Sequence, residues 1–126
     1  MIAVDTSTIV AYLQGALGKD TDLLDDALRA KQVILPPVVL TELLSDPKLG
    51  SDVVTLLNSF PKLEVTEGYW ERAGATRALV LAKGNKARIA DALIAQSCLD
   101  HRISLLTRDR DFGAFAKICG LVLLSP

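Results

Sequence analysis

The sequence predicts an α/β fold of three layers, with helices on both faces of a short, parallel central sheet. Short apolar runs alternate with longer segments of helical periodicity along the whole chain. The first run, Ile2–Val4, is apolar throughout, as expected for a strand that is buried on both faces. Half of the 126 residues are hydrophobic, which is enough for one core. We therefore expect a single domain over residues 1–126.

The first half of the chain predicts two strands and four helices. After the first strand, Thr6 or Ser7 is expected to cap a short helix. Pro37 suits the first turn of a later helix, because the N–H that proline lacks has no helical partner there. Asp46-Pro47 predicts a cap that is followed by a proline in the first turn. The expected strands are 2–4 and 33–35, and the later helices are 20–30, 37–45 and 46–59.

The second half predicts three strands and three helices. The expected strands are 63–66, 103–107 and 121–124, and the expected helices are 67–82, 87–101 and 111–118. The helix at 87–101 is almost entirely apolar near its start, so we expect it to be buried. His101 lies at the end of this helix, where an imidazolium favours the dipole, and we do not expect it to act as a catalytic base.

Composition and charge limit the possible functions. The formal net charge is −1 at pH 7, so any RNA contact must come from a local basic patch or through bound cations. Cys98 and Cys119 lie in apolar segments without metal-ligand spacing, which predicts reduced, buried thiols. No apolar run is long enough to span a membrane, and the start of the chain lacks the basic segment of a secretory signal. We therefore expect a cytoplasmic protein without membrane contact.

Three aspartates follow predicted strands. Asp5 ends the first strand, and Asp109 and Asp111 closely follow the strand at 103–107. Binding groups of open parallel sheets collect beyond the carboxyl ends of strands, so these carboxylates are candidate site residues. Taken one at a time, each is also explained by an ordinary turn or capping role. Asp5 is the hardest to explain in that way, because its strand should be central.

Two further acids interrupt apolar helical segments. Asp91 shares a predicted helix face with Ile94 and Cys98, where an ionised carboxylate is costly unless it is paired or binds a metal. A salt bridge to Arg88, one turn earlier on the helix, is the alternative explanation. Glu42 interrupts a second apolar helix, and a solvated face of that helix explains it almost equally well.

These acids could converge at one end of the sheet. Four carboxylates in one pocket repel one another, and no single lysine or arginine is expected to cancel their charge. Hard divalent cations do so, and Mg²⁺ or Mn²⁺ prefers oxygen ligands and substrate phosphates. Such an ion activates water and neutralises charge on a scissile phosphate. The pattern therefore predicts nuclease chemistry at Asp5, Glu42, Asp91 and Asp109.

Four segments resemble the motifs of PIN domains, and most closely those of VapC-type toxin ribonucleases. Each motif is weak alone, but four in order at this spacing, over the whole chain, are specific. The segments are Val4-Asp5-Thr6-Ser7, Pro37 through Glu42-Leu43, Ala90-Asp91-Ala92-Leu93-Ile94-Ala95 and Leu106-Thr107-Arg108-Asp109-Arg110-Asp111-Phe112. The resemblance implies a PIN-like α/β/α fold and a Mg²⁺- or Mn²⁺-dependent endoribonuclease, the toxin of a type II toxin–antitoxin pair.

The resemblance also implies roles for individual residues and partners. Thr6, Ser7 or Thr107 would hydrogen-bond a metal-bound water or a carboxylate, although helix capping explains the first two equally well. Asp111 is either a further acid near the metal or the N-cap of a helix that begins at Phe112. Family members commonly form homodimers and are inhibited by an antitoxin whose tail enters the acidic groove. The metal ligands that the resemblance implies, directly or through water, are Asp5, Glu42, Asp91 and Asp109.

Basic residues near these acids are candidate RNA contacts. As a group they could bind phosphates, whereas each one singly is better explained as solvated surface charge. The candidates are Lys83, Lys86, Arg88, Arg108 and Arg110.

Other functions fit the sequence less well. An aspartyl-phosphate phosphatase would need a second aspartate where Ser7 stands, and a P-loop or Rossmann site would need glycines directly after the first strand. Among PIN-like proteins, a housekeeping RNA-processing nuclease and a catalytically idle interaction module are the alternatives to a toxin.

Overall fold

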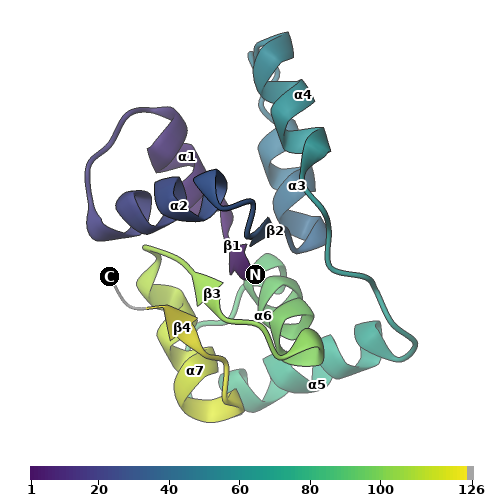
Figure 1. The fold of residues 1–126 in the computed structure, drawn as a ribbon. Coiled ribbons are helices and arrows are strands. Elements are labelled where there is room, and N and C mark those ends of the chain that lie inside the picture. The colour runs from purple at the N-terminus through teal and green to yellow at the C-terminus, as the bar shows by residue number, and fades with distance from the viewer. Residues whose placement is uncertain (125–126) are drawn as a thin grey trace.

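The sheet that organises the molecule has four parallel strands in the order β2-β1-β3-β4 (Figure 1). The computed structural model describes residues 1–124. Ala3 is paired with Ile34 on one side and with Leu105 on the other, so β1 is a central strand. The predicted α/β class with its short parallel sheet is confirmed. The strands are β1 (Ile2–Val4), β2 (Val33–Ile34), β3 (Leu105–Leu106) and β4 (Leu123–Leu124).

Helices cover both faces of the sheet. α1 and α2 lie on one side in Figure 1, and α5, α6 and α7 lie on the other. After β2 the next strand, β3, lies on the other side of β1. Because connections between parallel strands are as a rule right-handed, this change of side is expected to place the later helices on the opposite face. The helices are α1 (Thr6–Leu13), α2 (Lys19–Arg29), α3 (Pro37–Leu44), α4 (Ser51–Ser59), α5 (Tyr69–Ala82), α6 (Ile89–His101) and α7 (Gly113–Cys119), with a 3₁₀ turn, η1 (Arg110–Phe112), before α7.

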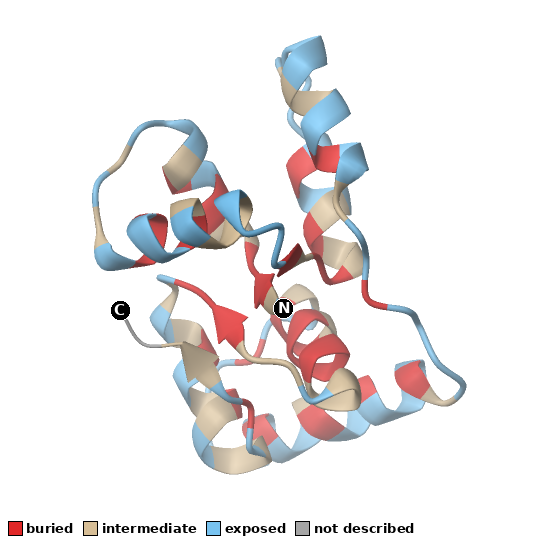
Figure 2. Cartoon of the chain, in the orientation of Figure 1, coloured by how far each residue is buried: buried red, intermediate tan, exposed pale blue. Residues whose placement is uncertain are grey.

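Burial is concentrated in the strands and in α6 (Figure 2). Ala3, Val4 and Leu105 are fully buried, as the apolar strand runs predict. α6 is buried over most of its circumference, including the polar residues Gln96 and Ser97. A carboxylate near the start of this helix is therefore enclosed by protein. Within residues 1–124, no helix is both long and apolar enough to cross a membrane.

The helix predicted at 46–59 begins later than expected. Asp46 does not cap it, because its Oδ1 accepts a hydrogen bond from the N–H of Lys48 at 2.9 Å. This bond closes a local turn over residues 46–48 and competes with helix formation. The regular helix, α4, starts only at Ser51, after Gly50.

The strand predicted at 63–66 is absent from the sheet. Leu63 donates its N–H to the carbonyl of Leu35 at 2.9 Å, and Leu35 donates to Pro61 at 2.9 Å. This contact amounts to one isolated bridge beside β2. The side chains of residues 64–67 are all exposed, so no packing against the core stabilises this segment as a strand.

Candidate metal centre

A cleft of about 380 Å³ opens at the carboxyl end of the sheet, where β1, α1, α3, α6 and the loop after β3 meet. β1 lies between β2 and β3, so the strand order reverses at β1. Such a switch point is where open parallel sheets place ligand sites. The four acids of the sequence motifs all line this cleft, whose lining consists of Asp5, Thr6, Ser7, Glu42, Arg88, Ala90, Asp91, Ile94 and Asp109.

Asp5 is buried directly after β1 and caps α1. Its N–H donates to the carbonyl of Leu106 at 3.1 Å, which fixes the residue at the sheet edge. Its carboxylate accepts hydrogen bonds from Ser7 Oγ at 2.8 Å and from the N–H of Thr8 at 3.3 Å. Burial raises the pKa of Asp5 to about 6, although these hydrogen bonds oppose the shift. The prediction that Thr6 or Ser7 caps the helix was wrong, because the cap lies at the strand end itself.

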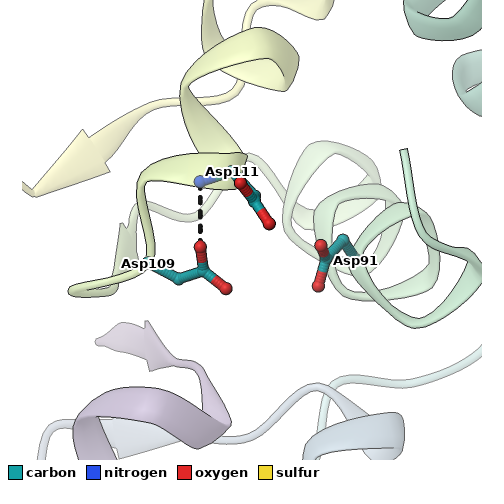
Figure 3. Close-up of side chains that lie close together, drawn as sticks. All are labelled: Asp91, Asp109 and Asp111. Atoms are coloured by element: carbon teal, nitrogen blue, oxygen red, sulfur yellow. Dashed lines mark hydrogen bonds between the residues drawn. The ribbon is translucent and has the colours of Figure 1, made fainter. Parts of the chain in front are cut away.

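The loop after β3 presents two further aspartates. Asp109 Oδ1 accepts a hydrogen bond from the N–H of Asp111 at 2.9 Å and so caps η1 (Figure 3). The alternative in which Asp111 caps a helix beginning at Phe112 is therefore wrong. Asp111 instead lies in the first turn, and Figure 3 shows its carboxylate beside Asp109 and facing Asp91.

Asp91 faces this pair from the first turn of α6. One oxygen from each of Asp91, Asp109 and Asp111 lies within 4.8 Å of the others, close enough for a single metal ion to contact all three. Asp91 is only 7% exposed, and its neighbours on the helix face are buried, as the sequence predicts. Burial raises the pKa of Asp91, while the Arg88 guanidinium lowers it.

Arg88 neutralises part of this negative charge, although one guanidinium cannot cancel the charge of all the carboxylates in the cleft. Its Nε lies 3.2 Å from Asp91 Oδ2, so the salt bridge left open by the sequence is present. Its Nη2 lies 3.1 Å from Asp109 Oδ2 and 3.3 Å from Asp111 Oδ2. Arg88 has an extended backbone as the N-cap of α6, and its side chain reaches across to the loop after β3. Lys86 Nζ approaches the same loop, 3.5 Å from Asp111 Oδ2.

Hydroxyl side chains lie beside the carboxylates. Thr6 Oγ1 donates to Glu42 Oε1 at 2.7 Å, and Glu42 itself is exposed on α3 at the rim of the cleft. Ser7 Oγ lies 3.4 Å from Thr107 Oγ1. Thr107 Oγ1 also accepts a hydrogen bond from the N–H of Asp109 at 2.9 Å. These bonds connect the ends of β1 and β3 and hold the acids of both loops in place.

The other basic residues that are candidate RNA contacts differ in their exposure and in their partners. Lys83 is exposed at the end of α5, and Arg110 is exposed in η1. Arg108 turns away from the acidic cleft, because its Nε and Nη2 both lie 2.8 Å from the carboxylate of Asp20. Arg108 and Arg110 line a second hollow, and Asp109 lines both this hollow and the cleft.

Asp20 is a buried acid that the sequence does not reveal. It lies in the first turn of α2, is 3% exposed and accepts a further hydrogen bond from Thr8 Oγ1 at 3.0 Å. The hydrogen-bonded Arg108 guanidinium lowers the pKa of Asp20 to about 2. A Cβ at Gly18 would lie 2.7 Å from Asp20 Oδ1, so the carboxylate fills the space of a side chain there. Asp20 thus joins α1, α2 and the loop after β3 next to the cleft.

The donor set fits a hard divalent cation. The clustered atoms of Asp91, Asp109 and Asp111 are carboxylate oxygens, the ligands that Mg²⁺ and Mn²⁺ prefer, and Asp5 and Glu42 add oxygens to the same cleft. Mg²⁺ and Mn²⁺ bound by such residues usually keep other coordination positions for water and substrate phosphate. A histidine or cysteine is not among its lining residues, which disfavours a zinc site.

Comparisons with known proteins identify the family of this chain. The family model described as PIN domain matches residues 2–118. The chain belongs to the PIN-domain family. Two similar solved structures are FitAB bound to an IR36 DNA fragment, and FitAcB from Neisseria gonorrhoeae. A sequence comparison with curated proteins found no match.

The structural likeness extends over the whole PIN domain. FitAB bound to DNA is 18% identical, with a TM-score of 0.72 over 98% of this chain and 94% of that one. FitAcB is 20% identical, with a TM-score of 0.72 over 100% of this chain and 98% of that one. PIN domains are generally nucleases, and this PIN domain carries an acidic cluster of the kind that metal-dependent nucleases need.

Proposed function

We propose that this PIN domain is a Mg²⁺- or Mn²⁺-dependent endoribonuclease that acts as a single domain. The observation that carries the proposal is the convergence of Asp91, Asp109 and Asp111 to within 4.8 Å at the switch point of the sheet. Burial there raises the pKa values of Asp5 and Asp91, so a bound cation would relieve an unfavourable concentration of charge. Mg²⁺ and Mn²⁺ are hard cations that prefer carboxylate oxygens, water and substrate phosphates as ligands.

The acids of the cleft would contribute to metal binding in different ways. Asp91 and Asp109 would bind it directly, with Asp111 as an additional ligand, while Asp5 and Glu42 would act directly or through water. When bound, the ion supplies an activated water and neutralises charge on the scissile phosphate. Thr6 keeps Glu42 oriented, and Ser7 and Thr107 keep the two strand ends in register. These hydroxyls would also bond metal-bound waters.

RNA is proposed to run from the cleft into the hollow after β3. The two cavities share Asp109, and the second is lined by Arg108 and Arg110. Arg110 and Lys83 are exposed and therefore accessible to a phosphate backbone. Contacts from the paired residues, Lys86, Arg88 and Arg108, would require them to exchange carboxylate partners for phosphate.

The biological role we propose is that of a toxin with an inhibitory antitoxin partner, acting as a homodimer in the cytoplasm. The support is the resemblance of all four motifs to VapC-type toxins, with the motif acids gathered around one cleft. A housekeeping RNA-processing nuclease is the second candidate, since the same site would serve it. A short antitoxin-like reading frame directly beside the gene distinguishes the two.

Metal removal is the direct test of the chemistry. We expect the purified protein to cleave RNA with Mg²⁺ or Mn²⁺ and to lose at least about a hundredfold in rate with excess EDTA, because metal activation supplies several kcal/mol to the transition state. Added Mn²⁺ should restore the rate. Mass spectrometry of the products should show 5′-phosphate and 3′-hydroxyl ends, because water and not the RNA 2′-hydroxyl attacks.

An Asp91→Asn protein prepared in parallel controls for a contaminating ribonuclease and should not cut. Cleavage that survives EDTA, or products that end in a 2′,3′-cyclic phosphate, would show that the proposed chemistry is wrong.

The RNA path predicts an effect on salt dependence. Arg110→Gln should weaken RNA binding and flatten the slope of log affinity against log salt by about 0.7 unit, the loss of roughly one phosphate contact. Binding is measured by fluorescence anisotropy in an Asp5→Asn background, so that the RNA is not cut. Arg102→Gln is the matched control, because Arg102 is exposed at the opposite end of α6. An equal slope for both variants would place the RNA elsewhere.

A further inference from the structure

Arg88 contacts the same three carboxylates that the proposed metal ion would bind. Its guanidinium lies between α6 and the loop after β3, within 3.1–3.3 Å of Asp91, Asp109 and Asp111. These three residues are the ones whose oxygens approach within 4.8 Å of one another. A positively charged group of the chain itself therefore lies at the cluster.

The contacts of individual oxygen atoms show how the guanidinium and a metal ion would compete. Asp109 Oδ1 is engaged as the cap of η1 by the N–H of Asp111. The other oxygen, Oδ2, is the one that can turn to a cation, and it is the oxygen that Arg88 Nη2 contacts at 3.1 Å. Asp91 contacts the same guanidinium through its Oδ2 at 3.2 Å. A metal bound by these oxygens would lie next to the guanidinium, where like charges repel.

The Arg88 side chain can also move away from the carboxylate cluster. Arg88 is the N-cap residue of α6 but makes no capping hydrogen bond with its side chain, so the helix does not depend on the guanidinium. About half of the side chain (54%) is exposed. The stem can therefore rotate into solvent, or toward a phosphate in the cleft, without opening the core.

We propose that Arg88 is an internal cation that occupies the carboxylate cluster in the metal-free protein and is displaced when the metal binds. This inference rests on the metal centre proposed above. It assigns Arg88 a positioning role with two states: bridging the three aspartates before loading, and free to meet the RNA phosphate afterwards. The ion must displace the guanidinium, so Arg88 lowers the apparent metal affinity of the wild-type protein.

Calorimetric titration with Mn²⁺ tests the competition without any cleavage assay. Arg88→Gln should bind Mn²⁺ at least about tenfold more tightly than wild type, because the competing charge is gone. Arg102→Gln removes the same charge from an exposed arginine at the opposite end of α6 and should change the affinity less than twofold. Arg88→Lys keeps the charge but loses the planar fork, so its affinity should lie between those of wild type and Arg88→Gln.

Thermal melts separate competition from a merely structural bridge. In EDTA, Arg88→Gln should melt below wild type, because the repelling carboxylates lose their internal cation. In saturating Mn²⁺ this deficit should disappear. A permanent structural bridge would instead lower the melting temperature under both conditions and leave the affinity unchanged or weaker.

A measurement on the wild-type protein tests the proposal even if Arg88→Gln does not fold. In ¹⁵N spectra, the Arg88 Nε–H signal, assigned by its loss in Arg88→Lys, should shift on addition of Mg²⁺. An unmoved signal with Mg²⁺ bound would overturn the displacement. If wild type binds Mn²⁺ and Arg88→Gln binds it no more tightly, the competition alone is wrong. If neither protein binds Mn²⁺, the metal centre is wrong as well.

Discussion

Asp5→Asn should abolish RNA cleavage and at the same time stabilise the metal-free protein at neutral pH. Burial raises the pKa of Asp5 to about 6 from its ordinary 3.8, so the folded state holds the charged form unfavourably. That shift corresponds to about 3 kcal/mol at pH 7, part of which asparagine recovers by removing the charge. Asparagine can still accept the hydrogen bonds of Ser7 and Thr8, and it is as good an N-cap as aspartate. We expect a gain of about 2 kcal/mol.

The stability difference between wild type and Asp5→Asn should depend on pH. Below about pH 4 the Asp5 carboxyl is neutral in both the folded and the unfolded state, so wild type and Asp5→Asn should be equally stable there. As the pH rises from about 4 to 6, the unfolded Asp5 ionises before the folded one, so wild type loses stability that Asp5→Asn keeps. Urea denaturation in EDTA at pH 4 and pH 7 measures the difference.

Cleavage in Mn²⁺ is measured in parallel and should fall at least about a hundredfold, because a charged metal ligand is lost. Asp26→Asn is the control, since Asp26 is an exposed aspartate on α2 and its substitution should change stability by less than about 0.5 kcal/mol. An Asp5→Asn protein that melts far below wild type yet still cuts RNA would show that Asp5 is structural.

Asp20→Asn should do the reverse: it should destabilise the protein and spare the chemistry. The Asp20 carboxylate accepts two hydrogen bonds from Arg108 and one from Thr8, and the hydrogen-bonded Arg108 lowers its pKa to about 2. Asparagine offers one carbonyl oxygen and no charge, so we expect a loss of about 2 kcal/mol at pH 7. Cleavage should stay within tenfold of wild type below the melting temperature, because Asp20 does not line the cleft.

The pH dependence of Asp20 has the opposite sign. Its stabilisation is fully present above about pH 4 and is lost as the pH falls toward 2, where the folded carboxylate is protonated. Wild type and Asp20→Asn should therefore converge in acid, with the largest difference at pH 7. Asp26→Asn, in the same helix, again serves as the control. If Asp20→Asn were as stable as wild type but inactive, Asp20 would belong to the site rather than to the scaffold.

The parts of the fold that the sequence predicts are those that burial determines. The apolar run Ile2–Val4 can satisfy its backbone and its side chains only inside a parallel sheet, and it is the central strand. The segment 63–66 has β-branched residues, but residues 64–66 are exposed to solvent, so propensity alone did not make it a strand. Local hydrogen bonding decided the start of α4, where Asp46 closes a turn that periodicity does not detect.

The site was predictable where an acid breaks an apolar pattern, as Asp91 does on α6. The ion pairs and hydrogen bonds between distant segments around the site were not predictable. Arg88 meets Asp109 and Asp111, 21 and 23 residues later, and Asp20 meets Arg108, 88 residues later. No spacing rule links such residues. Only the order of the strands brings them together.

The turns that hold the acids also begin the next structural element. Asp5 caps α1 and Asp109 caps η1, whereas Asp91 accepts no capping bond in α6. Selection for helix starts alone would preserve a capping residue, aspartate or asparagine among others, at the first two positions in a descendant without nuclease activity. Asp91, buried and useful only beside a cation, would be the first to drift to a neutral residue. We therefore expect an apolar residue at position 91 to mark an inactive relative more clearly than another capping residue at position 5 or 109.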